Sequence, residues 1–150
     1  MKKFYAHFEP GKVRELKSGL NIPLTYDFWP LLISYFIEKS DVFHIDCWID
    51  EIEGIERASL FGRNVESYNE NVKSFEGRIT KEFVQEIVNK PFDQEGKVKW
   101  FNIDFKKGTE MFLSCQHNGC EFVTGWLNSK DAEYIKSVIP EDFSFHTFRG

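Results

Sequence analysis

The sequence predicts a single α+β domain, residues 1–150, in which antiparallel sheets pack against helices. Apolar and polar residues alternate along 42–50 and again along 98–105, as in strands with one buried face. Apolar residues at helical spacing follow each group of predicted strands, so the order of three strands and a helix occurs twice. We therefore expect two antiparallel sheets of three or four strands from a β-β-β-α pseudo-repeat, plus an N-terminal helix.

The first half of the chain contains the N-terminal helix and the first repeat unit. Pro30 fits only the first turn of a helix, which Thr25 or Asp27 caps. Thr80 caps a later helix, and Pro91 ends it. The predicted elements, in chain order, are a strand or arm at 4–8, a helix at 28–37, extended segments at 42–50, 55–63 and 72–79, and a helix at 81–90.

The second half repeats this order. The pair Asn118-Gly119 is a strong hairpin signal, because both residues tolerate a positive φ. Ser129 caps the last helix, which ends before Pro140. The predicted elements are strands at 98–105, 111–117 and 120–127, a helix at 130–139 and an edge strand at 143–148.

Alternation also assigns side chains to faces of the sheet. The residues of 42–50 that we expect to face the core are Phe43, Ile45, Cys47 and Ile49. The intervening residues, which we expect to face outward, are Val42, His44, Asp46, Trp48 and Asp50. In the strand at 98–105 the same reasoning points Phe101 inward and Trp100 outward.

The charge and cysteine content restrict the class of protein. Nineteen Lys and Arg against 24 Asp and Glu give a net charge of −5, the wrong sign for binding a nucleic-acid backbone, so we expect a basic protein partner and no nucleic acid. The chain has only three cysteines, an odd number that cannot all pair within one chain, so a disulfide scaffold is not indicated. The longest apolar stretch, residues 28–37, is too short to span a membrane, and no secretion signal follows Met1, so we expect the cytoplasm.

Cys115, His117 and Cys120 have the donor atoms that zinc accepts. The predicted hairpin places His117 opposite Cys120, and Cys115 opposite Phe122, on one face. That face also carries apolar residues, and no fourth ligand lies nearby in the sequence, whereas structural zinc sites have four. We therefore expect core packing here, and no metal or other cofactor.

His44 and Asp46 lie two positions apart on one strand and therefore on one face, where they can interact. Catalysis through a nucleophile also needs a positioned Ser or Cys and an oxyanion hole, and the sequence contains neither a nucleophile elbow nor a phosphate-binding loop. We expect that the protein is not an enzyme.

One stretch of the sequence combines an outward aromatic residue with acidic residues. The expected partner-binding residues are Asp46, Trp48, Asp50, Glu51, Glu53 and Glu56. A tryptophan ringed by carboxylates has the composition of a binding hot spot for a cationic partner. The alternative is a solvated loop with Trp48 covered, and Trp100 is a second candidate with the same alternative.

Residues 20–26, Leu-Asn-Ile-Pro-Leu-Thr-Tyr, followed by Phe28-Trp29, resemble the helix entry of immunity proteins of contact-dependent growth inhibition. The resemblance implies a small acidic bacterial protein that binds and neutralises a toxin domain, with a sheet-and-helix repeat similar to the Whirly fold. Two other functions remain open from the sequence. These are a Whirly-like binder of single-stranded nucleic acid and a small-molecule-binding or hydrolytic domain that uses His44 or His117.

Overall fold

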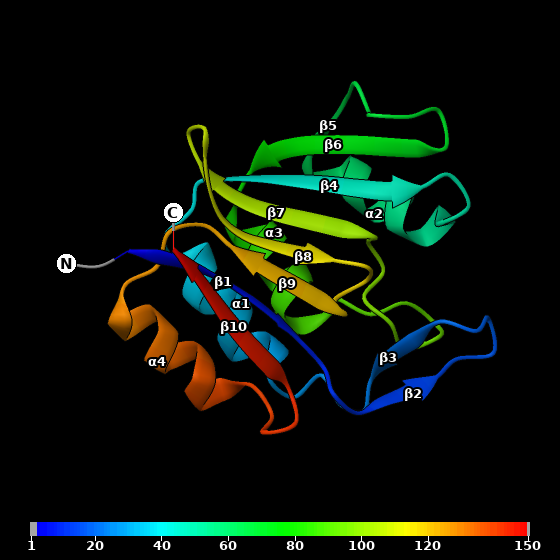
Figure 1. Ribbon diagram of the computed structural model, residues 1–150. Helices are drawn as coiled ribbons and strands as arrows, with labels where there is room; N and C mark the ends of the chain where they lie inside the picture. The colour runs from blue at the N-terminus through cyan, green and yellow to red at the C-terminus, as the bar shows by residue number, and fades with distance from the viewer. Residues whose placement is uncertain (1–2, 150) are drawn as a thin grey trace.

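The computed structural model describes residues 3–149, and most of its strands form one large antiparallel sheet (Figure 1). The strands lie in the order β10 (Ser144–Arg149), β1 (Phe4–Glu9), β9 (Glu121–Thr124), β8 (Glu110–Gln116), β7 (Asn102–Lys107), β4 (Val42–Trp48), β6 (Val72–Arg78) and β5 (Arg63–Val65). A small second sheet pairs β2 (Val13–Glu15) with β3 (Asn21–Pro23). The structure thus confirms the single α+β domain.

The division of strands between the sheets differs from the prediction. Two sheets of similar size were expected, one from each repeat unit, but β4 of the first unit pairs with β7 of the second from Val42↔Lys106 to Asp46↔Asn102. Joining the two units satisfies two strand edges that would otherwise present unpaired backbone groups. The predicted N-terminal strand is present as β1, and the predicted edge strand as β10, which pairs with it.

Helices α1 (Trp29–Ile37), α2 (Ile52–Phe61) and α3 (Lys81–Asn89) lie behind the sheet in Figure 1, and α4 (Ser129–Val138) packs beside α1. The core between helices and sheet is rich in phenylalanine. Phe43 of β4 stacks on Phe83 of α3 with ring centroids 4.1 Å apart, and Phe8 stacks on Phe122 at 5.0 Å. No helix within residues 3–149 is both long enough and apolar enough to cross a membrane.

Helix α2 replaces the extended segment that was expected at residues 55–63. Its buried residues are Gly54 and Ala58, which lie four positions apart and so share one helical face. A Cβ atom on Gly54 would lie 2.3 Å from the carbonyl oxygen of Lys99, so the helix approaches that backbone only because this residue has no side chain. The buried face of α2 is formed by two small residues and not by large apolar ones. Hydrophobic periodicity therefore did not predict this helix.

The predicted helix ends are right at some positions and wrong at others. Thr80 caps α3 by accepting a hydrogen bond from the Phe83 amide, as expected, and Pro30 lies in the first turn of α1. The cap of α4 is Asn128, not Ser129, because the Asn128 side chain accepts from the Asp131 amide in a capping box. Neither Thr25 nor Asp27 caps α1, whose N-cap is Phe28 without a side-chain bond.

The predicted hairpin is present as β8 and β9, and Cys115 lies opposite Phe122, as expected. The predicted pairing of His117 with Cys120 is wrong, because the last pair is Gln116↔Glu121. His117, Asn118 and Gly119 all have positive φ, so the turn is longer than the two residues that the Asn-Gly pair indicates. Cys47, Cys115 and Cys120 are free thiols.

Three of the predicted face assignments are corrected, those of Ile49, Trp100 and Phe101; Phe101, expected to face the core, is only half-buried and its ring packs against that of Trp48. Phe43, Ile45 and Cys47 are buried as expected, but β4 ends at Trp48 and Ile49 is 48% exposed. Trp100 was expected to face outward, yet it is fully buried, and its indole nitrogen donates to the Gly54 carbonyl at 2.8 Å. Strand β7 begins only at Asn102, so alternation does not extend back to Trp100 and Phe101.

We expect Cys115→Ser to lower the free energy of unfolding by about 1 to 3 kcal/mol, because it places a hydroxyl in an apolar site. Cys115 is buried in the core cluster, whereas the neighbouring Gln116 is half-buried on the opposite face. Gln116→Ala is therefore expected to change stability by less than about 1 kcal/mol. Urea unfolding of both variants is the measurement, and equal midpoints would contradict the assignment of faces.

Candidate functional site

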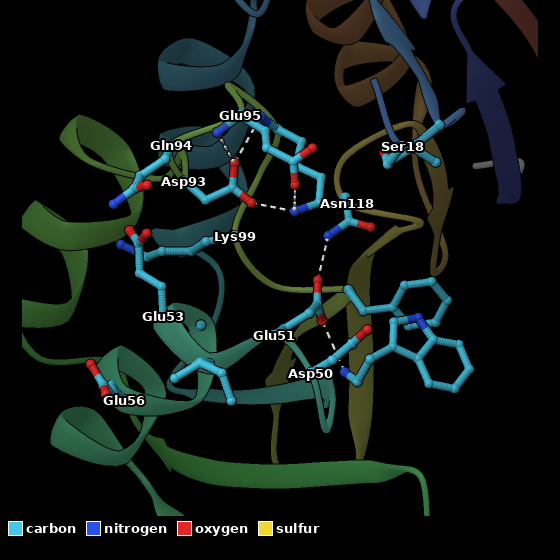
Figure 2. Close-up of a pocket in the computed structure, with 16 residues that line it drawn as sticks. Ser18, Asp50, Glu51, Glu53, Glu56, Asp93, Gln94, Glu95, Lys99 and Asn118 are labelled. Atoms are coloured by element: carbon cyan, nitrogen blue, oxygen red, sulfur yellow. Dashed lines mark hydrogen bonds and ion pairs between the residues drawn. The ribbon is translucent and has the colours of Figure 1, made fainter. Parts of the chain in front are cut away.

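A hollow of about 960 Å³ lies where β4 ends and α2 begins (Figure 2). Figure 2 shows Glu53 and Glu56 along α2 on one side and Asp93 and Glu95 on the facing segment. The carboxylates that line it are Asp50, Glu51, Glu53, Glu56, Asp93 and Glu95, against two lysines, Lys97 and Lys99. We call this surface the acidic hollow.

The structure brings five of the six predicted partner-binding residues to this hollow. Trp48, Asp50, Glu51, Glu53 and Glu56 all line it. Trp48 is 36% exposed, so the alternative that it is covered is wrong. That a partner binds these residues remains a prediction.

Both lysines of the acidic hollow already have anionic partners. Lys97 pairs with Asp93 and lies 3.6 Å from the Glu95 carboxylate, and Lys99 pairs with the buried Glu86 of α3. Within residues 3–149, the structure contains no ion pair for Asp50, Glu53 or Glu56, all of which are exposed. These three carboxylates give the hollow an uncompensated negative charge.

Glu51 fixes the shape of the rim. Its carboxylate accepts one hydrogen bond from the Trp48 amide and one from the Asn118 side chain, each 2.9 Å long (Figure 2). The same amide nitrogen of Asn118 also donates to the Val98 carbonyl at 2.9 Å. Burial raises the pKa of Glu51, while the bonds from Asn118 and Trp48 oppose this rise. Glu51 therefore ties the Trp48 segment to the β8–β9 turn.

An aromatic row borders the carboxylates. The Trp48 ring lies 4.8 Å from that of Phe101, and Phe101 lies 5.5 Å from the ring of His117. Ile52, at the start of α2, also lines the hollow and is exposed. The rim of the hollow thus combines apolar side chains with negative charge. Protein–protein interfaces have the same composition, with a central apolar hot spot surrounded by polar residues.

Asp46, the sixth predicted residue, lies elsewhere. It is buried on the sheet face that carries His44, and its Oδ1 atom accepts bonds from Ser74 Oγ at 2.6 Å and His44 Nε2 at 2.8 Å. The other ring nitrogen of His44 lies 3.0 Å from Glu76. Asp46 is therefore a bonded structural carboxylate, and it does not contribute to the acidic hollow.

The arrangement around His44 does not suit nucleophilic catalysis. The interaction expected between His44 and Asp46 is present, but the Ser74 hydroxyl donates to the aspartate and not to the histidine. A histidine base activates a serine only by accepting its proton. Since carboxylates occupy both ring nitrogens, His44 has no nitrogen available for that role.

We expect the stability of the protein to fall as the pH rises through about 8, and the cause to be His44. The hydrogen bond to Asp46 raises the pKa of His44 to about 8, from an ordinary value near 6.5, against the opposing effect of burial. A histidine whose pKa is higher in the folded than in the unfolded state stabilises the fold fully at a pH below its unfolded-state pKa. This stabilisation is lost as the pH rises above the folded-state pKa, and for His44 the loss is about 2 kcal/mol between pH 6 and 9.

Urea unfolding of His44→Gln at pH 6 and pH 9 tests this expectation, and the variant should lose most of the difference between the two pH values. The control is His146→Gln, at an exposed position of β10, which should keep the wild-type difference. An equal pH dependence in all three proteins would contradict the role of His44.

The structure does not bring Cys115, His117 and Cys120 together. Cys115 is buried in the core, and His117 is exposed and bonded to Glu121. Cys120 lies beside Tyr26, its Sγ is 3.3 Å from the Asn21 carbonyl, and burial raises the pKa of its thiol to about 11. The core packing of Cys115 is confirmed, and the three residues form no joint site.

Sequence reasoning missed the far wall of the hollow. Asp93, Glu95 and Lys97 line the hollow from the segment between α3 and β7, and Figure 2 shows Asp93 and Glu95 opposite α2. Their local composition, two acids near a glycine, was visible in the sequence, but their position across from Glu53 depends on the tertiary fold. Lys99, which also lines the hollow, and its ion-pair partner Glu86 belong to no recognisable sequence pattern.

The fold and the site define this protein as an α+β domain with an acidic, aromatic-rimmed hollow. No family model matches the chain, and searches of curated proteins and of solved structures also found no match.

Proposed function

We propose that this protein is an immunity protein that binds and neutralises a basic bacterial toxin domain through the acidic hollow. The observation that carries the proposal is the half-exposed Trp48 beside three carboxylates that have no ion pair within residues 3–149. In this proposal Trp48 is the anchor, and Asp50, Glu53 and Glu56 are the charged rim.

The physical chemistry of such an inhibitor fits this surface. A toxin that cleaves nucleic acid has to attract a polyanion, so its active-site surface is basic and complements an acidic hollow. Covering that surface takes about 800 Å² per partner and no catalytic group. The negative charge accelerates encounter, and the buried aromatic residue supplies most of the affinity.

A growth assay tests the proposal. The candidate toxin domain is the one encoded beside this gene, and it is expressed in bacteria with and without this protein in the cytoplasm, the compartment that the proposal assigns. Wild-type protein is expected to restore growth and to bind the purified toxin in a 1:1 complex. The variant Asp50→Asn/Glu53→Gln/Glu56→Gln is expected to protect poorly, although it remains folded.

A matched control separates the hollow from overall charge. Glu66→Gln/Glu70→Gln/Glu133→Gln changes the net charge by the same amount at exposed positions outside the hollow, and it should protect like the wild type. Equal loss of protection in the two triple variants would assign the effect to net charge and contradict the site. Failure of the wild-type protein to restore growth or bind the toxin would contradict the function.

A further inference from the structure

A second group of polar side chains converges on the sheet face opposite the helices, at the end of β1. His7 and Glu9 lie two positions apart on β1, so they share one face, and β9 places Glu121 beside them. Ligand atoms of His7, Glu9 and Glu121 lie within 4.8 Å of one another. These are nitrogen and oxygen donors of the kind that bind transition metals.

A second histidine, His117 of the β8–β9 turn, lies next to this group but outside the set of ligand atoms that are all within 4.8 Å of one another. The two oxygens of Glu121 hold two histidines, His7 Nε2 at 2.7 Å and His117 Nδ1 at 2.8 Å. The group of His7, Glu9, His117 and Glu121, here called the His–Glu cluster, thus comprises two imidazoles and two carboxylates. The hydrogen bond from His7 lowers the pKa of Glu121, and the proximity of His117 lowers it further.

The cluster also combines features that favour a cation. Glu9 and Glu121 place two carboxylates within 4.8 Å of each other, a like-charge arrangement that costs free energy unless positive charge lies between them. His7 and Glu121 are partly buried, whereas Glu9 and His117 are exposed, so an ion has access from solvent. His117 lies in a turn of positive φ and is not fixed by a strand.

We propose that the His–Glu cluster binds one divalent transition-metal ion, with Zn²⁺ as the physiological choice. In a tetrahedral zinc site with bonds of about 2.1 Å, neighbouring ligand atoms are separated by about 3.4 Å. The ligand atoms of His7, Glu9 and Glu121 already lie within 4.8 Å of one another, so these three side chains can close around an ion. His117, which pairs with the other oxygen of Glu121, has to move toward them to become the fourth ligand. The ion joins β1 to the β8–β9 turn.

His7, Glu9 and Glu121 do not line the acidic hollow, and this proposal does not rest on the proposed function. The expectation of no metal considered only Cys115, His117 and Cys120, whereas this proposal concerns a group built around His7, Glu9 and Glu121. The ligands of the His–Glu cluster lie up to 114 positions apart in the sequence, so no spacing motif relates them.

The test is titration of tag-free, chelator-treated protein with ZnCl₂ by calorimetry, with the visible absorption of Co²⁺ as a second readout. We expect one ion per chain and a rise in the unfolding temperature with Zn²⁺. His7→Gln and Glu121→Gln should weaken binding by about tenfold or more. His117→Gln changes an exposed turn residue, so it should weaken binding without affecting the fold, which circular dichroism checks.

Two control variants make the result specific. His44→Gln removes the other histidine that is bonded to carboxylates, and Cys120→Ser removes the accessible thiol nearest the turn; both should bind Zn²⁺ like the wild type. The proposal is overturned if no saturable 1:1 binding occurs, if the folded His117→Gln and Glu121→Gln variants bind like the wild type, or if Cys120→Ser abolishes binding.

Discussion

Glu86→Gln is expected to lower the free energy of unfolding by about 3 to 5 kcal/mol, the usual cost of leaving a buried charge without its partner. Glu86 is 5% exposed and lies between two cations. Arg57 donates two bonds to its carboxylate, at 2.7 and 2.8 Å, and the buried Lys99 pairs with the same group. Glutamine keeps the shape of the side chain but removes the negative charge.

The electrostatics of this group explain the size of the effect. Burial alone would raise the pKa of Glu86, but Arg57 and Lys99 lower it to about 2, so the carboxylate is ionised in the fold. Arg57 is partly exposed and water can solvate it in the variant, whereas Lys99 is 3% exposed and cannot be solvated without a structural change. The loss therefore arises mainly from Lys99.

Urea unfolding followed by the fluorescence of the buried Trp29 and Trp100 measures this loss. The control, Glu82→Gln, changes an exposed residue one helical turn earlier and should cost no more than about 1 kcal/mol. Glu86→Gln/Lys99→Met removes the unpaired cation as well and should recover most of the stability. Equal losses in Glu82→Gln and Glu86→Gln, or no recovery in the double variant, would contradict the role of the pair.

Trp48→Ala is expected to weaken toxin binding by about 2 kcal/mol or more, roughly thirtyfold, mainly through faster dissociation. The reason is that Trp48 is an exposed aromatic side chain that lines the hollow beside its carboxylates. Glu53→Gln removes one rim charge and is expected to slow association and flatten its salt dependence, with little change in dissociation. Stopped-flow rates at two salt concentrations separate the two effects.

The sequence offers a matched control for Trp48. Trp126 is also exposed, but it lies beside Tyr5 near the far edge of the sheet, away from the hollow. Trp126→Ala should therefore bind the toxin with wild-type rates. Unchanged rates in Trp48→Ala, or equal losses in the two tryptophan variants, would place the interface elsewhere.

Many patterns that depend on neighbours in the chain were predicted well, although the N-caps of α1 and α4 and the length of the β8–β9 turn were not. Alternation located β4, β6 and β8 and the burial of Phe43 and Cys115, and the Asn118-Gly119 pair located the hairpin turn. The acidic stretch around Trp48 could be read from the sequence because its residues lie on consecutive elements, β4 and α2. Such patterns report local geometry, which nearby residues determine.

Three further errors arise from contacts between residues that lie far apart in the chain. Trp100 and Asp46 both belong to alternating patterns that indicated an outward side chain, but groups far away in the chain bury them, Gly54 for Trp100 and Ser74 for Asp46. The α2 helix was missed because small residues that pack against a distant backbone carry its buried face.

The sequence by itself determined the α+β class, the order of most strands and helices, and the acidic stretch around Trp48, whereas the exposure of Trp48 was decided by the tertiary structure. Tertiary structure decided that the two repeat units share one sheet, that Asp93 and Glu95 face the Trp48 segment, and that His7 meets Glu121. The reason is that strand pairing sets contacts between residues of large sequence separation, and hydrophobic periodicity specifies which face is buried without specifying the partner strand.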